Sequence, residues 1–275
     1  MILDDILKKE FKSTLNQYHE SLWRSTLSGE IDFIDRTVES FEKVNIHNRN
    51  QFLKTRSKKL HPKPKVRFYP FGRLFILNNA TVEMGDLFFV YKHFLNGILN
   101  EHRAIVVQAK HTKASSKSWR IDTDQFRLLS KWPPFQFEKK AFQKLYHIRP
   151  RALTWATYGF VGLSATRYPL YCSSKRMLRE IKSIPSSNTF TFKLLNSSGW
   201  DSSTSFLLKF IQGFAGENLR RNSRALDLVK DLYTVAEWEP DPPGDPKWET
   251  GKKGEEGFGI IEFTVTTERD EKRDS

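Results

Sequence analysis

Cysteine is almost absent from this chain: its 275 residues include one, Cys172. A single cysteine excludes an internal disulfide bond and excludes zinc sites built from a cysteine cluster. No catalytic partner lies near it in the sequence, so we interpret Cys172 as a structural residue. This usage fits a reducing compartment, and we expect a cytoplasmic protein.

Long apolar runs and several common motifs are also missing. No run reaches the length of a membrane span, and residues 1–15 lack the apolar segment of a signal peptide, so we expect no membrane association. The seven histidines show neither HxH nor HExxH spacing, which argues against a zinc hydrolase. The chain has no GxxxxGK[ST] motif and therefore no recognisable NTP-binding loop.

Acidic residues are in deficit. There are 32 of them against 45 lysines and arginines, a formal charge of +13. Such a chain favours polyanions, nucleic acid before an anionic membrane. An apolar content of 38%, with 13% aromatic residues, predicts a packed core rather than a disordered chain. The length suits one large domain or one domain with a substantial appendage.

The clearest local pattern lies in residues 82–110. Two short apolar runs, 87–91 and 104–107, are separated by a polar segment that contains Asn96-Gly97 and Asn100-Glu101. Aromatic and β-branched residues fill the runs, and turn-forming residues fill the gap. This pattern predicts a β-hairpin or two adjacent strands.

Polar residues stand at one end of this pair of runs. Asp86 opens the first run, and Gln108 and Lys110 close the second. Because alternate residues of a strand share a face, Gln108 and Lys110 point one way and Ala109 the other, and Asp86 can face the pair. Carboxylate, amide and carbonyl oxygens suit Mg²⁺ or Mn²⁺. A lysine beside them can position or deprotonate a water, or stabilise charge on a phosphate, as phosphodiester hydrolysis requires.

The series Asp86…Gln108-Ala109-Lys110 resembles the PD-(D/E)xK motif of restriction-endonuclease-like nucleases. Asp86 matches the aspartate of the motif and Lys110 its lysine. Gln108 stands where Glu or Asp is usual, a known variant that makes one metal ligand neutral, and no proline precedes Asp86. The resemblance covers residues 31–131, under half of the chain.

The resemblance implies an α/β (α+β) fold with a restriction-endonuclease-like core, in which helices flank a mixed central sheet and extra elements follow at the C-terminus. It implies a deoxyribonuclease dependent on Mg²⁺ (or Mn²⁺), an endonuclease rather than an exonuclease, with a role in bacterial restriction or phage defence. DNA is the expected partner, and nothing in the sequence separates RNA from it. A homodimer, a partner ATPase or helicase, or a sensor subunit also fits such a nuclease.

The expected catalytic residues are Asp86, Gln108, Lys110 and Glu83. The expected metal ligands are Asp86, Gln108 and the carbonyl of Ala109. Glu83 could take the place of Asp86, because Gly85 permits a bend that brings in either carboxylate.

Further candidates come from the flanking segments. Nucleases of this superfamily often place a helical acid beside the motif strands, and Glu39 and Glu42 are candidates for it, with solvated helix charges as the alternative. Four basic residues just beyond Lys110 are expected to contact nucleic acid: His111, Lys113, Lys117 and Arg120.

The remaining pattern predicts the other elements. Amphipathic helices are expected over residues 1–27 and 31–44, and a helix capped by Asp122 or Thr123 over 125–132. Residues 45–65 read as a basic loop, either solvated or touching a phosphate backbone. Aromatic residues in a strand within 151–163 are expected mainly in the core, with base stacking as the alternative: Trp155, Tyr158 and Phe160.

Two parts of the chain are expected to pack together as one domain. Residues 1–135 would hold the N-terminal helices and the nuclease-like core. Residues 136–275 would complete the sheet and add the C-terminal helices and a final strand over 258–267, with Ile261, Phe263 and Val265 on one face.

Two alternatives to the nuclease remain open at this point. Asp86 and Lys110 could be strand-end charges that form a surface ion pair, with Gln108 merely polar. The chain could also be a non-catalytic subunit that keeps the nuclease-like fold and binds nucleic acid or a protein partner, since basic charge and aromatic residues would serve either role.

Overall fold

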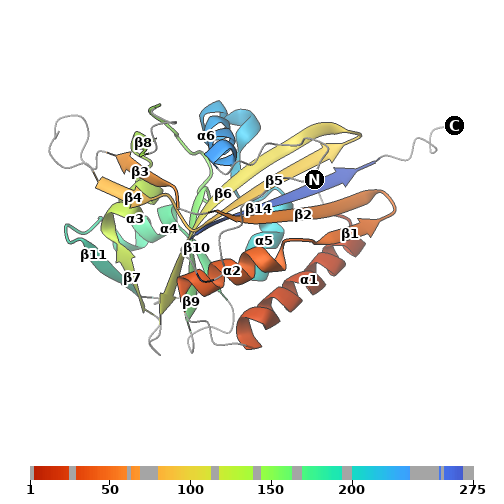
Figure 1. Cartoon of the computed structure of the whole chain (residues 1–275), viewed down its shortest axis with the longest axis horizontal. Helices are drawn as coiled ribbons and strands as arrows, with labels where there is room; N and C mark the ends of the chain where they lie inside the picture. Colours follow the sequence, from red (N-terminus) through yellow and green to blue (C-terminus); the bar gives the residue numbers. More distant parts are fainter. Residues whose placement is uncertain are drawn as a thin grey trace.

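The computed structural model describes residues 3–24, 29–60, 63–68, 80–112, 118–138, 144–162, 169–193, 200–235, 254 and 257–268. Over these residues the protein is a mixed α/β structure, with a large mixed sheet flanked by helices (Figure 1). None of the helices in these segments is both long and apolar enough to cross a membrane.

The large sheet has the strand order β1-β2-β14-β5-β6-β9-β10-β12, and β13 pairs with β6 beside this path. Its strands are β1 (Asn45–Asn48), β2 (Gln51–Leu60), β14 (Phe258–Thr267), β5 (Leu87–Leu95), β6 (Ile98–Thr112), β9 (Ala156–Gly162), β10 (Leu170–Ser173), β12 (Asp201–Ser202) and β13 (Glu217–Asn218). The pairs β14–β5 and β6–β9 are parallel, and the other pairs are antiparallel.

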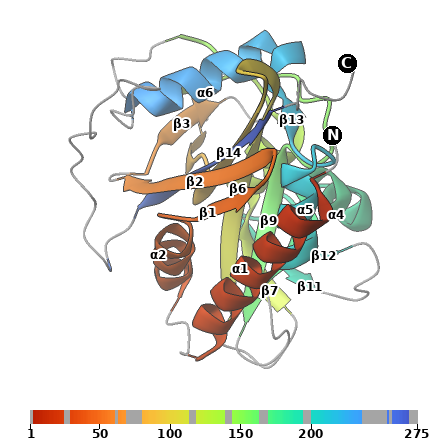
Figure 2. The same ribbon diagram turned by 90° about the vertical axis from the view of Figure 1, so that its right-hand side faces the viewer.

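Helices cover both faces of this sheet (Figures 1 and 2). One face packs against α1 (Asp5–Arg24), α2 (Glu30–Ser40) and α5 (Ser203–Ile211). The other packs against α3 (Thr123–Lys131), α4 (Ser174–Ile181) and α6 (Ser223–Val235). Two small sheets lie on this second side: β4 (Ala80–Glu83), β3 (Lys65–Phe68) and β8 (Phe135–Phe137) in one, β7 (Ser118–Asp122) and β11 (Thr189–Lys193) in the other.

Strands β5 and β6 are central because both of their faces are apolar. Phe88 of β5 packs into the core on the α6 side, and its neighbour Phe89 packs into the core on the α1 side. A strand buried on both faces needs a continuous apolar run, which residues 87–91 and 104–107 provide. The prediction of two adjacent strands is confirmed.

The turn between these strands is shorter than the sequence suggested. Asn96 and Gly97 have φ angles of 48° and 76°, the left-handed conformation that a tight hairpin turn needs. Asn100 and Glu101 were also expected in the gap, but they lie within β6. The Asn-Gly pair closes the hairpin by itself, so the following polar residues are free to extend the strand.

Helix α1 follows the predicted apolar stripe. Leu7, Phe11 and Leu15 are fully buried at steps of four residues. Ile6 is 55% exposed because it lies one position away from this buried face. The predicted amphipathic helix is confirmed over Asp5–Arg24.

The prediction of a basic loop over residues 45–65 is wrong for most of its length. Residues 45–48 and 51–60 are strands β1 and β2. Strand β2 pairs with β14 along its full length, and Lys58 and Lys59 are buried there. The partner strand lies about two hundred residues further along the chain, so no local pattern in this polar segment could reveal the pairing.

Strand β14 completes the sheet from its interior. It lies between β2 and β5, parallel to β5, with Ile261, Phe263 and Val265 packed on the α1 side, as predicted. The large sheet therefore contains strands from both predicted parts of the chain.

The aromatic residues around β9 belong to the core. Trp155 is 1% exposed, and Tyr158 and Phe160 are fully buried. Base stacking by these three residues is thereby contradicted, because a ring enclosed by the core presents no face to a base.

Acid is expected to loosen the contact between α1 and α5 through His19. The ring of His19 hydrogen-bonds the hydroxyl groups of Ser203 and Thr204, and burial lowers the pKa of His19 to about 4. Below its ordinary pKa of 6.5, the unfolded chain binds a proton that the folded protein excludes. The free energy of unfolding should therefore fall by roughly 3 kcal/mol through the protonation of His19 as the pH falls from about 6.5 to about 4.

Denaturant unfolding at several pH values checks this expectation. His19→Gln should lose less stability over that interval than the unchanged protein, whereas His47→Gln, at an exposed position, should follow the unchanged protein. An equal loss in all three proteins would contradict a role for His19.

Candidate functional site

Asp86 is held at the start of β5 by its backbone. Its N–H donates to the carbonyl of Val107 at 2.9 Å, and its carbonyl accepts from Gly259 at 2.8 Å. The preceding Gly85 lies so close to β6 that a β-carbon there would fall 2.7 Å from Cγ1 of Val106. Glycine at this position thus allows the chain to bring Asp86 against β6.

The Asp86 carboxylate meets the predicted residues of β6. Its Oδ2 accepts the backbone N–H of Ala109 at 2.8 Å and the side-chain amide of Gln108. Asp86 is fully buried and Gln108 is 1% exposed. The expected contact of Asp86 with Gln108 is confirmed, whereas the Lys110 ammonium pairs with Glu30. A surface ion pair at Asp86 is contradicted by the burial of its carboxylate.

Only one of the two polar atoms of the Gln108 side-chain amide has hydrogen-bond partners among the described residues. Its Nε2 lies between Asp86 Oδ2 and the Ala109 carbonyl, 3.2 Å from the latter, while its Oε1 is buried with no hydrogen-bond partner among the described residues. Rotating the amide by half a turn would aim three oxygens at one point. That arrangement is favourable only with a cation between them, so these residues fit a bound divalent cation.

Lys63, just before β3, provides a positive charge in the site that the sequence did not single out. Its ammonium bridges Asp86 Oδ1 at 2.8 Å and Glu83 Oε2 at 3.0 Å. Burial lowers the pKa of Lys63, but the attraction of Asp86 and then Glu83 outweighs it, so the net pKa lies above its ordinary value. Lys63 therefore stays charged and compensates the two carboxylates.

A third acid reaches the site from the first turn of α2. Glu30 lies 3.4 and 3.5 Å from the Lys110 ammonium through its two carboxylate oxygens, and its Oε1 accepts the N–H of His111 at 3.3 Å. The helix thus delivers a carboxylate to the end of the Gln108-Ala109-Lys110 segment.

This finding corrects the choice of helical acid. Glu39 and Glu42 are exposed, and Glu39 lies nine residues along α2 from Glu30, roughly 13 Å at 1.5 Å per residue. Only the first turn of the helix faces Lys110. An acid in a first turn is common for reasons of helix polarity alone, so the sequence signal at Glu30 was weak.

The charges of this cluster act on one another. Burial raises the pKa of the Asp86 carboxyl, and the ammonium groups of Lys63 and Lys110 oppose that rise. Lys110 is 14% exposed on its side chain and Glu30 32%, so the cluster opens to solvent on the Lys110–Glu30 side. The Lys110 ammonium is therefore accessible from solvent, while Asp86 remains enclosed.

Comparison with known proteins assigns neither a family nor a function to this chain. No family model matches the chain, and no curated protein or solved structure is detectably similar to it. The chemistry of the site therefore has to be argued from its own residues.

The other predicted site residues lie partly at the Asp86 cluster, partly away from it and partly outside the described residues. Glu83 lies at the end of β4 with its carboxylate on Lys63, and its backbone carbonyl accepts from Gln125 Nε2 at 3.2 Å. Arg120 of β7 donates to Thr189 at 3.1 Å on an exposed edge. Lys113 and Lys117 lie outside the described residues.

The described segments contain no metal site built from acidic, histidine or cysteine side chains alone. No group of three His, Cys, Asp or Glu residues is arranged there to hold an ion. A cation beside Asp86 would thus depend on the neutral oxygens of Gln108 and Ala109, as the predicted ligand set requires.

Proposed function

We propose that this protein is a metal-dependent nuclease with a restriction-endonuclease-like core that hydrolyses phosphodiester bonds in DNA. The observation that carries the proposal is the buried contact of the Asp86 carboxylate with Gln108 and Ala109, next to Lys110. The order of elements also supports it, since strands β5 and β6 are followed by the short strand β7 and helix α3, and helix α2 brings Glu30 to the Lys110 end of β6.

The unpartnered oxygen of Gln108 supports a site in which three groups would hold the ion once the amide is rotated: Asp86, Gln108 Oε1 and the Ala109 carbonyl. A divalent ion held there would lower the pKa of its bound water and neutralise negative charge on the phosphate.

The side chains of the cluster have separate tasks in this proposal. Lys110 positions or deprotonates the attacking water, or stabilises the charge that develops on the phosphate. Glu30 orients Lys110 through its two contacts with the ammonium. Lys63 neutralises the buried Asp86 and the partly exposed Glu83, which lets the two carboxylates lie close together in the folded protein.

The direct test is incubation with supercoiled plasmid and, separately, with a single-stranded RNA, in Mg²⁺, in Mn²⁺ and in EDTA. We expect plasmid cleavage with either metal and none in EDTA, and no cleavage by Asp86→Asn in any condition. Cleavage in EDTA, or full activity of Asp86→Asn, would disprove the proposal, and cleavage of RNA alone would change the substrate.

A second candidate is a non-catalytic nucleic-acid-binding protein. Two observations favour it: the neutral Gln108 at an acidic position of the motif, and the Lys63 ammonium already seated on Asp86. Binding of plasmid without cleavage of any substrate in either metal would support this candidate.

Removing the charge of Glu30 is expected to slow cleavage without unfolding the protein. Glu30→Gln should reduce the rate by roughly 10- to 100-fold, the usual cost of losing a group that orients a reactive side chain. The matched control is Glu39→Gln, which removes one charge from the exposed part of the same helix. Plasmid cleavage rates and melting temperatures of both variants provide the measurement, and equal rates would rule out a positioning role for Glu30.

A further inference from the structure

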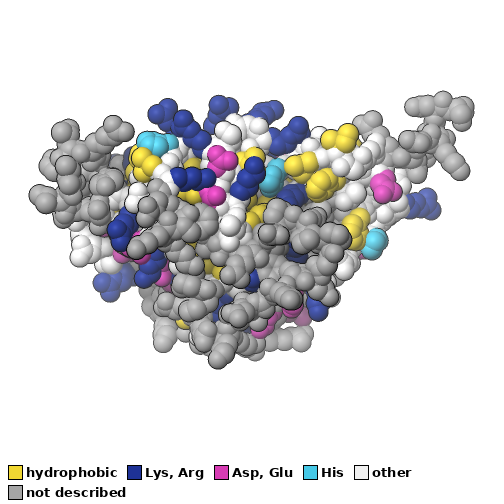
Figure 3. Space-filling model, turned by 45° about the horizontal axis from the view of Figure 1, so that its top comes forward, with side chains coloured by type: hydrophobic (Ala, Val, Ile, Leu, Met, Phe, Trp, Pro, Cys, Tyr) yellow, Lys and Arg dark blue, Asp and Glu magenta, His cyan; other side chains and the backbone are white. Residues whose placement is uncertain are grey.

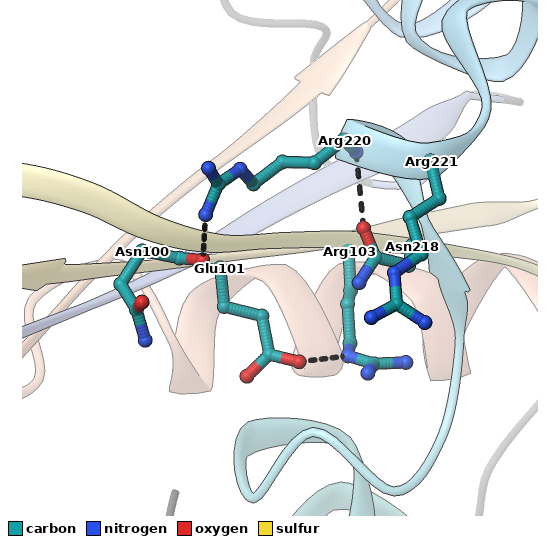
Figure 4. Close-up of a pocket in the computed structure, with 6 residues that line it drawn as sticks. All are labelled: Asn100, Glu101, Arg103, Asn218, Arg220 and Arg221. Carbon is teal, nitrogen blue, oxygen red and sulfur yellow. Dashed lines mark hydrogen bonds and ion pairs between the residues drawn. The ribbon is translucent and has the colours of Figure 1, made fainter.

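A polar pocket lies at the end of β6 away from Lys110. It has a volume of about 530 Å³ and is lined by Asn100, Glu101, Arg103, Asn218, Arg220 and Arg221 (Figure 4). The first three residues come from β6, and the others from β13 and the short 3-10 helix η2 (Leu219–Arg221). Three arginines against one glutamate give the lining an excess of positive charge.

Hydrogen bonds within the protein hold two of these arginine side chains in place but do not use all of their N–H donors. Arg103 donates to Glu101 Oε1 at 2.6 Å and to the Gly216 carbonyl at 3.1 Å. Arg220 donates to the Asn100 carbonyl across the pocket. Each guanidinium has more N–H groups than these bonds use, and its planar fork matches the oxygens of a phosphate.

An exposed aromatic residue follows, in the chain, a glycine that lies against the lining of this pocket. Gly213 lies directly against Glu101, where an added β-carbon would be 2.7 Å from Oε2, and the next residue is Phe214. Phe214 is 72% exposed, unlike the buried phenylalanines of the core. An aromatic face open to solvent beside arginines is the combination on which nucleic-acid bases stack.

The pocket is separate from the candidate active site. Arg103 and Lys110 are seven residues apart on β6, roughly 23 Å at 3.3 Å per residue. One phosphate cannot occupy both places. A strand of a DNA duplex that ran directly from one place to the other would span about seven nucleotide steps, at about 3.4 Å each.

We propose that this pocket binds a nucleotide unit, with its phosphate on Arg103, Arg220 and Arg221 and its base against Phe214. The phosphate could belong to a nucleic-acid strand or to a free nucleotide. Lysine and arginine side chains also lie along the upper margin of the face in Figure 3, so basic charge is not confined to the pocket. The test must therefore separate the pocket from general attraction to a basic protein.

The experiment measures fluorescence anisotropy in EDTA, so that no cleavage occurs. The probes are a labelled single-stranded DNA of about 20 nucleotides and a fluorescent ATP analogue. The variant Arg220→Ala/Arg221→Ala removes two charges from the pocket. The control Lys9→Ala/Lys12→Ala removes two charges from exposed positions of α1. A second comparison leaves charge unchanged: Phe214→Ala against Ile6→Ala, which is also exposed.

We expect the arginine variant to weaken DNA binding by roughly tenfold or more and to lower the salt dependence of binding, with the lysine control near twofold. Phe214→Ala should weaken binding by roughly fivefold or more and Ile6→Ala should not. Loss of ATP-analogue binding with unchanged DNA binding would assign the phosphate to a free nucleotide.

Equal effects of the pocket variants and their controls on both probes would overturn the proposal. Should the arginine variant fail to fold, as judged by circular dichroism, the Phe214→Ala comparison decides. The result is independent of the proposed hydrolysis: a nuclease that binds DNA elsewhere would still cut plasmid in Mg²⁺, and a pocket that binds would do so in a protein that never cuts.

Discussion

Lys110→Met should abolish plasmid cleavage while leaving the fold and DNA binding intact. The Lys110 ammonium lies on the open side of the cluster, held by Glu30, and its charge acts on the Asp86 carboxyl. Methionine keeps the length and apolar stem of the side chain but can neither transfer a proton nor stabilise charge on phosphate. We expect a loss of roughly 10²- to 10⁴-fold in the cleavage rate, the range for removing a group of this kind.

A neighbouring lysine provides the control. Lys92 of β5 is 16% exposed on its side chain and pairs with Glu262 at 2.9 Å, so it resembles Lys110 in its own burial and in pairing with a glutamate. Glu262 is more buried than Glu30, so Lys92→Met should lower the melting temperature at least as much as Lys110→Met, yet leave the rate within about threefold. A large loss of activity in both variants would mean that the effect comes from breaking an ion pair rather than from the reaction.

Gln108→Glu should make the stability of the protein depend on divalent metal. The Gln108 amide now donates to Asp86 Oδ2 inside a buried cluster. A glutamate there would place a second carboxylate against the first, replacing a hydrogen bond by repulsion and raising the pKa of the pair. We expect a loss of roughly 2–4 kcal/mol at neutral pH without metal.

The stability that Gln108→Glu loses should depend on pH, in a direction set by the raised pKa of its carboxyl group. A carboxyl whose pKa is raised by folding opposes folding at a pH above that raised value, and the opposition disappears once the pH falls below its pKa in the unfolded chain. In EDTA, the difference in melting temperature between the unchanged protein and Gln108→Glu should therefore shrink as the pH is lowered toward about 4. At neutral pH, added Mn²⁺ should restore stability, because an ion bound only by the folded state stabilises it.

Gln125→Glu is the matched control for this prediction. Gln125 is 6% exposed and also lies at the cluster, where it donates to the Glu83 carbonyl. It is not among the predicted metal ligands, so Mn²⁺ should restore little of the stability that this variant loses. Equal recovery in both variants would show that Mn²⁺ does not act through position 108.

The sequence identified the central hairpin because its two strands are buried on both faces. Residues 87–91 and 104–107 had to be apolar for that position, and Asn96-Gly97 had to form a tight turn. Once that hairpin is placed, the alternation of a strand puts Gln108 and Lys110 on one face and brings Asp86 beside them. This part of the candidate site could be predicted because strand geometry is local and regular.

Only the tertiary structure decided which other residues join that cluster. Glu30 and Lys63 come from separate segments that look like an ordinary helix start and an ordinary basic stretch, yet their side chains reach Lys110 and Asp86. The same holds for β2, a polar segment that becomes a strand because β14 pairs with it from the far end of the chain. Local pattern fixes the geometry of neighbouring residues, whereas contacts between distant segments depend on how the whole sheet assembles, which no short stretch encodes.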